Sequence, residues 1–221
     1  MKIALFGGCV PRGVCSFYSG TGEVEFTKNK YSLAVCLQDK FGTTVLDYSM
    51  RRSGLHHSGN IPFPNETMAN PSNSVENKIK THNLDGVTHM IVWAPSNDYG
   101  AGVKLEDYLK ALDSIIEFVT NKGIKLVFIT SPCRYQYKKE YIPSGCYTKT
   151  NSSGLSLNDY ADAVIQKCLS SNIPCIDFRK QTVVTDDNNR ETMPDALHPT
   201  PETSKEWNDF IYNNIINFIH K

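Results

Sequence analysis

A carboxylate and an imidazole lie three residues apart near the end of the chain, in the stretch MPDALHPTPE (residues 193–202). On a tight turn, the Asp195 carboxylate can bind one nitrogen of the His198 ring and leave the other nitrogen facing outward. This arrangement fixes the tautomer of the ring and stabilises its protonated form, as a general base requires. The spacing therefore predicts a general base, although a pair of exposed surface residues is the alternative.

A candidate nucleophile lies at the other end of the chain. Cys9 follows a short apolar run, residues 3–6, and two glycines, so we expect it in the loop that leaves a first strand. A thiol ionises far more readily than a hydroxyl, and cysteine hydrolases use a thiolate beside an imidazolium. Cys9 and His198 could therefore form a nucleophile and its base.

A candidate oxyanion donor follows another apolar run, in the stretch WAPSNDYG (residues 93–100). The side-chain amide of Asn97 could donate a hydrogen bond to a negative charge that develops on a reacting oxygen. The alternative is that Asn97 only closes a turn, as Asn and Asp often do.

The composition limits the partners. With 221 residues the chain fits a single domain, residues 1–221. Its 23 basic and 23 acidic residues cancel, so no overall field attracts nucleic acid or an anionic membrane. The sequence has neither a signal peptide nor an apolar run of membrane-spanning length, which favours a cytoplasmic protein or a module of a larger one.

The seven cysteines are an odd number in no CxxC array, which favours reduced thiols over a disulfide framework. Cys133 and Cys146 could nevertheless pair in an oxidising setting. The adjacent residues His56 and His57 point in different directions and have no evident third ligand. We expect neither a metal nor a cofactor.

Elements of two kinds alternate along the chain and must position these side chains. Helical periodicity appears in residues 31–40, 105–119 and 154–171 and again after Pro201, with Thr200 as its cap. Continuous apolar runs predict strands that are buried on both faces, at residues 2–6, 43–48, 89–94, 125–130 and 174–178. The pattern predicts an α/β fold with a parallel sheet of five strands. Cys9, Gly54 and Asn97 each follow a predicted strand, where such sheets bind their ligands.

Two long irregular stretches, residues 60–74 and 133–153, are candidate pocket walls or variable surface insertions. The second is rich in tyrosine, and Tyr135 is a candidate substrate-binding residue. Arg12 follows the first strand and could bind an anionic group of a substrate; a solvated loop charge is the alternative.

Taken together, the motifs resemble those of the SGNH hydrolases, also called GDSL-type esterases, over essentially the whole chain. Residues 195–199 match the family's Asp-x-x-His-Pro block, and residues 95–98 match Gly-x-Asn-Asp without its glycine. The family's Gly-Asp-Ser is replaced by Gly7, Gly8 and Cys9. Gly54, or Ser53 in a shifted register, corresponds to the glycine of the second block.

The resemblance implies a three-layer α/β/α fold of the flavodoxin-like type. It implies a catalytic triad of Cys9, His198 and Asp195, with an oxyanion hole formed by Cys9, Gly54 and Asn97. Because the family's nucleophile is a serine, three interpretations of Cys9 are open: a working nucleophile, a replaced serine with weak activity, and an inert thiol.

Three functions follow from these interpretations. The first is an acyl-ester hydrolase that acts on a small or carbohydrate-linked ester, such as an O-acetyl ester. The second is an acyltransferase that passes a thioester on Cys9 to an acceptor other than water. The third is a binding module that has lost catalysis and uses the tyrosine-rich loop to hold a sugar or a peptide.

Overall fold

The computed structural model describes residues 1–28, 31–50, 53–56, 74–94, 96–135 and 147–219. Its main sheet has five strands in the order β4-β1-β5-β6-β7, and every neighbouring pair is parallel. The strands are β1 (Lys2–Gly7), β4 (Thr44–Asp47), β5 (His89–Trp93), β6 (Lys125–Ile129) and β7 (Cys175–Ile176). This is the flavodoxin-like strand order, so the predicted five-stranded parallel sheet is confirmed.

Alternate residues of the central strands enter two different cores, which explains why the strand sequences are apolar throughout. In β1, Ala4 and Phe6 pack into one core, whereas Ile3 and Leu5 pack into the other. All four side chains are fully buried. The sheet therefore lies between two helical layers, as the continuous apolar runs predict.

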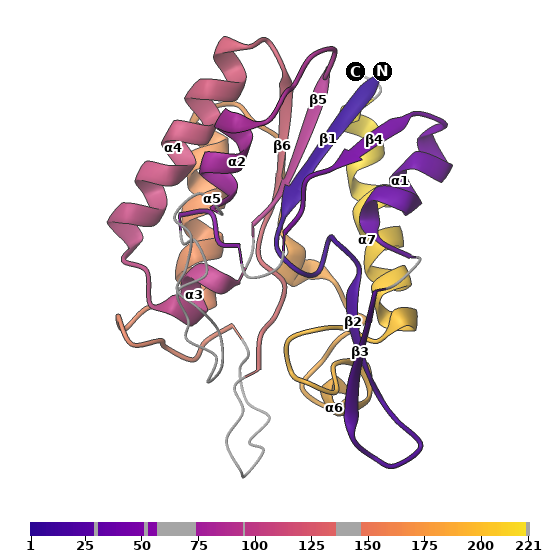
Figure 1. Cartoon of the computed structure of the whole chain (residues 1–221). Helices are drawn as coiled ribbons and strands as arrows, with labels where there is room; N and C mark the ends of the chain where they lie inside the picture. Colours follow the sequence, from indigo (N-terminus) through magenta and orange to yellow (C-terminus); the bar gives the residue numbers. More distant parts are fainter. Residues whose placement is uncertain (29–30, 51–52, 57–73, 95, 136–146, 220–221) are drawn as a thin grey trace.

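Helices cover both faces of the sheet (Figure 1). The helices α1 (Leu33–Phe41) and α7 (Pro201–Ile219) lie on one face. On the other lie α2 (Val75–Thr81), α4 (Leu105–Asn121) and α5 (Leu157–Ser170). The remaining helices are short: α3 (Asn97–Ala101), α6 (Asn189–Thr192) and the 3₁₀ turn η2 (Phe178–Lys180). In the described residues, no helix combines the length and the apolar character that crossing a membrane requires.

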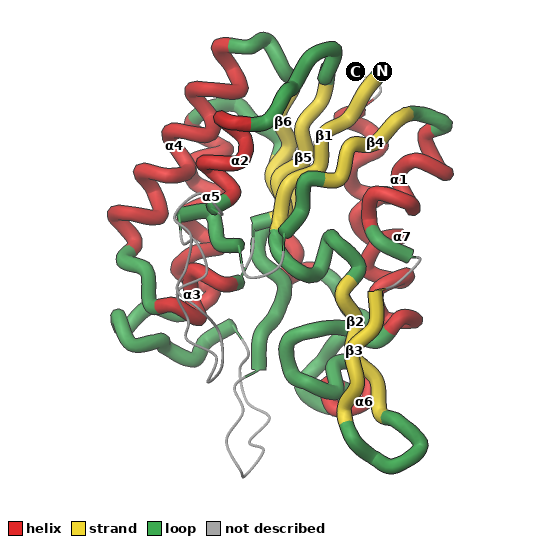
Figure 2. Tube along the Cα trace, viewed as in Figure 1, coloured by secondary structure: helices red, strands yellow, loops and turns green. Residues whose placement is uncertain are grey.

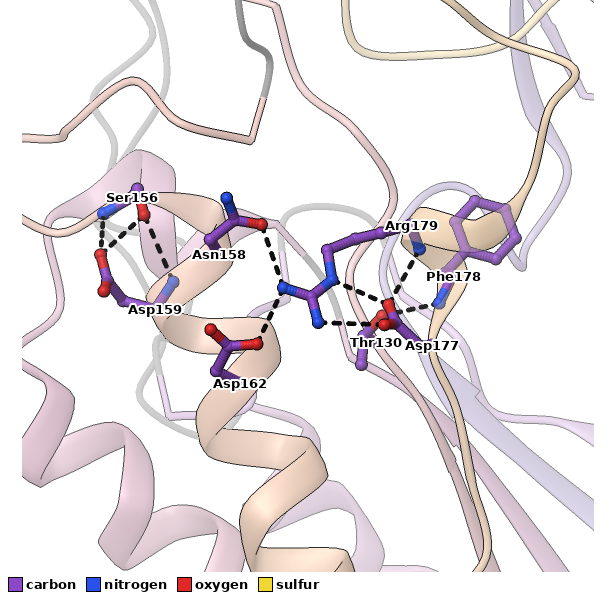
Figure 3. Close-up of polar contacts among 8 residues, drawn as sticks. All are labelled: Thr130, Ser156, Asn158, Asp159, Asp162, Asp177, Phe178 and Arg179. Carbon is purple, nitrogen blue, oxygen red and sulfur yellow. Dashed lines mark hydrogen bonds and ion pairs between the residues drawn. The ribbon is translucent and has the colours of Figure 1, made fainter.

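The helix ends follow capping residues in the sequence. The Thr200 side chain accepts a hydrogen bond from the Thr203 amide at the start of α7, as predicted. Ser156 and Asp159 form a reciprocal capping box at the start of α5 (Figure 3). These side chains satisfy amide groups that have no partner within the helix.

An arginine joins the end of the sheet to α5 (Figure 3). The Arg179 guanidinium donates two hydrogen bonds to the Asp177 carboxylate, at 2.8 and 3.0 Å. Its remaining terminal nitrogen lies 3.0 Å from Asn158 Oδ1 and 2.8 Å from Asp162 Oδ1, both on α5. A guanidinium that is held by two carboxylates fixes the chain directly after β7.

A hairpin that the sequence analysis did not predict lies beyond the carboxyl ends of the main sheet, beside α6 (Figures 1 and 2). Its antiparallel strands are β2 (Val14–Tyr18) and β3 (Val24–Lys28). The hairpin follows the Cys9 loop directly. Of the two irregular stretches, residues 60–73 and 136–146, Cys146 included, lie outside the described residues.

Candidate active site

Asp195 and His198 form the predicted pair. The His198 Nδ1 atom lies 2.5 Å from Asp195 Oδ2, and Asp195 Oδ1 accepts hydrogen bonds from the amides of Leu197 and His198 at 3.0 and 2.6 Å. The turn between them is tight, because Ala196 adopts a φ of 58°, in the left-handed region that a side chain disfavours. Nδ1 is occupied by the carboxylate, so Nε2 is the nitrogen that is left for proton transfer.

The surroundings favour the protonated form of His198. Burial of the ring lowers its pKa, but the hydrogen bond that the ring donates to Asp195 and the interaction with Cys9 outweigh burial and raise the pKa to about 9. The pKa of Asp195 is lowered: burial opposes ionisation, and the contacts with His198 overcome it. Nε2 is buried and makes no hydrogen bond of standard geometry with a described residue. The Cys9 side chain nevertheless contributes to the raised pKa of the ring.

Cys9, Asn97 and His198 line the same cavity, which encloses about 300 Å³ and opens to solvent. Its other walls include Trp93, Ser96, Pro132 and Leu197, and the Cys9 side chain is partly exposed in it. The loop that carries Cys9 bends closely over β1: a Cβ at Gly7 would lie 2.5 Å from the Pro11 ring.

The predicted Ser53–Gly54 segment adjoins the cavity through its contact with Asn97. One N–H of the Asn97 amide donates to the Ser53 carbonyl at 2.9 Å, which leaves its second N–H for another acceptor. Gly54 is buried but is absent from the cavity lining among the described residues. Gly54 is therefore linked to the site only through the neighbouring Ser53 carbonyl, and its place in the oxyanion hole stays a prediction.

Asp98 holds this loop in place, a role that the sequence analysis did not assign. Its fully buried carboxylate accepts the amides of Leu55 and His56 at 2.6 and 3.1 Å. A Cβ at Gly54 would lie 2.6 Å from the carboxylate oxygens, so only glycine allows this approach. The Asn-Asp sequence after β5 was the available signal.

The hairpin also contributes to the site. The fully buried Ser16 hydroxyl lies 3.1 Å from Asp195 Oδ1 and 2.8 Å from the His198 carbonyl, and the Ser16 amide donates to the Pro199 carbonyl at 3.0 Å. From β3, the Phe26 ring meets the His198 ring edge-on, with 5.8 Å between centroids. The hairpin thus contacts Asp195, His198 and Pro199 of this turn.

Comparison with solved structures identifies the fold. A lipase/acylhydrolase from Enterococcus faecalis superposes with a TM-score of 0.67 and 13% identity, over 98% of this chain and 96% of that one. A carbohydrate acetylesterase from Sinorhizobium meliloti gives 0.67 and 11%, over 98% and 99%. A protein described as lipolytic and of the G-D-S-L family, from Desulfitobacterium hafniense, gives 0.64 and 14%, over 96% and 98%. The chain has the SGNH hydrolase fold. The sequence itself matches no protein-family model and no curated protein.

Within the SGNH hydrolase fold, two predicted substrate-binding residues lie apart from the cavity lining. Tyr135 is buried in the core formed with α1 and α7, and its hydroxyl hydrogen-bonds to Asp186 at 3.2 Å. It is a core residue, and its role in binding substrate stays a prediction. Arg12 lies with Nη1 at 3.5 Å from the Ser49 carbonyl, and its role in binding stays a prediction.

Proposed function

We propose that the protein is an acyl-ester hydrolase in which Cys9 is the nucleophile, His198 the base and Asp195 the residue that orients His198. The observation that supports this proposal is the common cavity of Cys9, Asn97 and His198, with Asp195 bound to Nδ1 of the imidazole. On the same fold, solved proteins are described as carbohydrate acetylesterases. A small or carbohydrate-linked O-acyl ester, such as an O-acetyl ester, is therefore the proposed substrate.

The protonation of His198 favours a thiol over a hydroxyl nucleophile in this site. A ring whose pKa is raised to about 9, in part by Cys9 itself, is mostly protonated at neutral pH. An imidazolium is the partner that stabilises a thiolate. The active form is therefore a Cys9 thiolate beside protonated His198.

The reaction begins when the Cys9 sulfur attacks the carbonyl carbon and the electron pair of the C=O bond moves to oxygen. The second N–H of Asn97 and the backbone N–H of Cys9 donate to this oxyanion. The C–O bond then breaks as the intermediate collapses to a thioester. His198 gives its proton to the leaving alkoxide.

Water completes the cycle. His198, now neutral, takes a proton from water as the water oxygen attacks the thioester carbonyl. Collapse of the second intermediate breaks the C–S bond, releases the acid and restores the thiolate and the imidazolium. An amine or alcohol acceptor could replace water in this step, because thioesters react readily with both; the acyltransferase is thus the second candidate function.

Incubation with p-nitrophenyl acetate tests the proposal. We expect a burst of p-nitrophenol, and a gain of one acetyl group at Cys9 by mass spectrometry of the intact protein and its peptides. Both are expected to disappear in Cys9→Ala, and His198→Ala is expected to slow acylation by at least ~100-fold. Unchanged turnover in Cys9→Ala would remove the assignment, and a protein with neither burst nor adduct would support the binding module.

Acceleration of release by a particular amine or alcohol would assign the transferase instead. A panel of acceptors is added after the burst, and the rate at which the acetyl group leaves Cys9 is followed by intact mass. If water alone sets this rate, the hydrolase assignment holds.

A further inference from the structure

Arg134 brings a guanidinium next to the cavity, against the lining residue Ser96, without being a lining residue itself. It follows β6, two residues after the lining residue Pro132, and its Nη1 atom donates to the carbonyl of Ser96, another lining residue, at 3.3 Å. The guanidinium lies directly on α3, since a Cβ at Gly100 would be 2.3 Å from Nη1. A glycine at this position therefore leaves the space that the guanidinium occupies.

The charges of the candidate catalytic residues reach this guanidinium. Burial lowers the pKa of Arg134, and electrostatic interactions that include those with Cys9 and Asp195 partly offset that effect. The guanidinium is therefore within electrostatic range of the candidate nucleophile.

Arg134 differs from Arg179 in its partners. Arg179 is held by the carboxylates of Asp177 and Asp162. In the described part of the chain, no carboxylate lies within ion-pair distance of Arg134, and its contact with Ser96 uses a single N–H. The Arg134 side chain is partly exposed, so its remaining N–H groups are open to a bound group, and a guanidinium suits a carboxylate or a phosphate.

We infer that Arg134 forms an anion subsite beside Cys9, and that the substrate is an ester with a carboxylate or phosphate near its scissile carbonyl. This inference rests on the proposed function, because it gives that site its substrate class. The anion binds the free N–H groups of Arg134 while Cys9 attacks the carbonyl. A purely structural role, in which Arg134 only braces Ser96, predicts no preference for charged ligands.

Alkylation of Cys9 by a matched pair of reagents tests the subsite without measuring turnover. Iodoacetate and iodoacetamide are similar in size, and each loses iodide to the thiolate, but only iodoacetate is anionic. The ratio of their rates at Cys9 is measured by peptide mass spectrometry. We expect this ratio to fall about fivefold in Arg134→Met and to be largely retained in Arg134→Lys, since a charge in a partly hydrated site acts over several ångströms.

Two controls accompany this measurement. Cys36, a partly exposed thiol on α1, reports reagent reactivity in the same sample, and its ratio is expected to stay constant. Arg190→Met removes the same charge from an exposed position on α6 and is expected to leave the ratio at Cys9 unchanged.

The outcomes separate the two proposals. If neither reagent modifies Cys9, the nucleophile assignment fails. If both reagents modify Cys9 and Arg134→Met leaves the ratio of their rates unchanged, the anion subsite is wrong while the nucleophile assignment stands. If the ratio falls in Arg12→Met instead, the anion binds at Arg12, and the proposed subsite at Arg134 is also overturned. With esters, we expect 3-acetoxybenzoate to exceed its methyl ester in kcat/KM, and Arg134→Met to abolish that preference.

Discussion

The hydroxyl of Ser16 lies 3.1 Å from Asp195 Oδ1, although 179 positions separate the two residues in the sequence. The same oxygen accepts the amides of Leu197 and His198. Ser16 is therefore the one contact among these three that reaches the carboxylate from outside its own turn. Through this contact, the hairpin next to Cys9 helps to hold the Asp195 carboxylate, which in turn binds His198.

Ser16→Ala tests this contact. Because the variant removes a buried hydroxyl with two acceptors, we expect a loss of about 1 kcal/mol in the free energy of unfolding and a several-fold fall in kcat. A positioning role also predicts a lower pKa in the kcat profile, since Asp195 is held less firmly against His198. Ser19→Ala, in the turn of the hairpin, is the control; equal effects in both variants would contradict a specific role for Ser16.

Cys9→Ser separates thiol from hydroxyl chemistry. A serine hydroxyl ionises far less readily than a thiol, so we expect the serine variant to be at least ~100-fold slower than the native protein at pH 7. Because Cys9 is one of the groups that raise the pKa of His198, we also expect a lower pKa for the ring in the serine variant. Measurement of kcat/KM from pH 6 to 10 checks this, and a serine variant with native activity at pH 7 would refute the ion-pair mechanism.

The raised pKa of His198 also predicts how stability depends on pH. The folded protein holds this proton up to about pH 9, whereas an unfolded histidine releases it near 6.5. The contribution of the ring alone is therefore fully present below pH 6.5 and is lost as the pH rises to 9, by up to about 3 kcal/mol, and the proposed ionisation of Cys9 contributes with the opposite sign. Urea unfolding at pH 6 and at pH 9.5 measures it. The difference should be much smaller in His198→Gln; an equal difference in that variant would assign the loss to other groups.

Gly54→Ala tests the close approach of Asp98. A Cβ at this position would lie 2.6 Å from the carboxylate oxygens, so the Asp98 side chain or the loop must move. We expect a destabilisation of about 1–3 kcal/mol, with a fall in kcat because the loop also carries Ser53, to which Asn97 bonds. Gly20→Ala is the matched control, since nothing lies within 4 Å of its Cβ. Equal unfolding free energies for the two variants would contradict this account.

The sequence predicts the main sheet because its central strands are buried on both faces. Ile3 and Ala4 enter opposite cores, so neither position needs a polar residue. The hairpin gives no such signal. Phe26 and Tyr18 are more than half exposed, and Ser16 is polar but fully buried, so its strands have neither a continuous apolar run nor a regular alternation.

At the site, the sequence predicts the local pair and misses the contacts that distant segments make. Asp195 and His198 are close in the chain, so their spacing alone suggests the hydrogen bond. Asp98 binds amides more than 40 positions earlier, which no local pattern encodes. Tyr135 was chosen because it begins a tyrosine-rich stretch, but residue type does not distinguish a pocket wall from a buried ring whose hydroxyl has a partner.

The hairpin has a mechanical consequence. Its first strand is hydrogen-bonded at one end to the Cys9 carbonyl, through the Val14 amide, and two residues later to the Pro199 carbonyl, through the Ser16 amide. One short strand therefore links the loop that carries Cys9 to the turn that carries His198. We therefore expect a displacement of this strand to move the Cys9 loop and the His198 turn together.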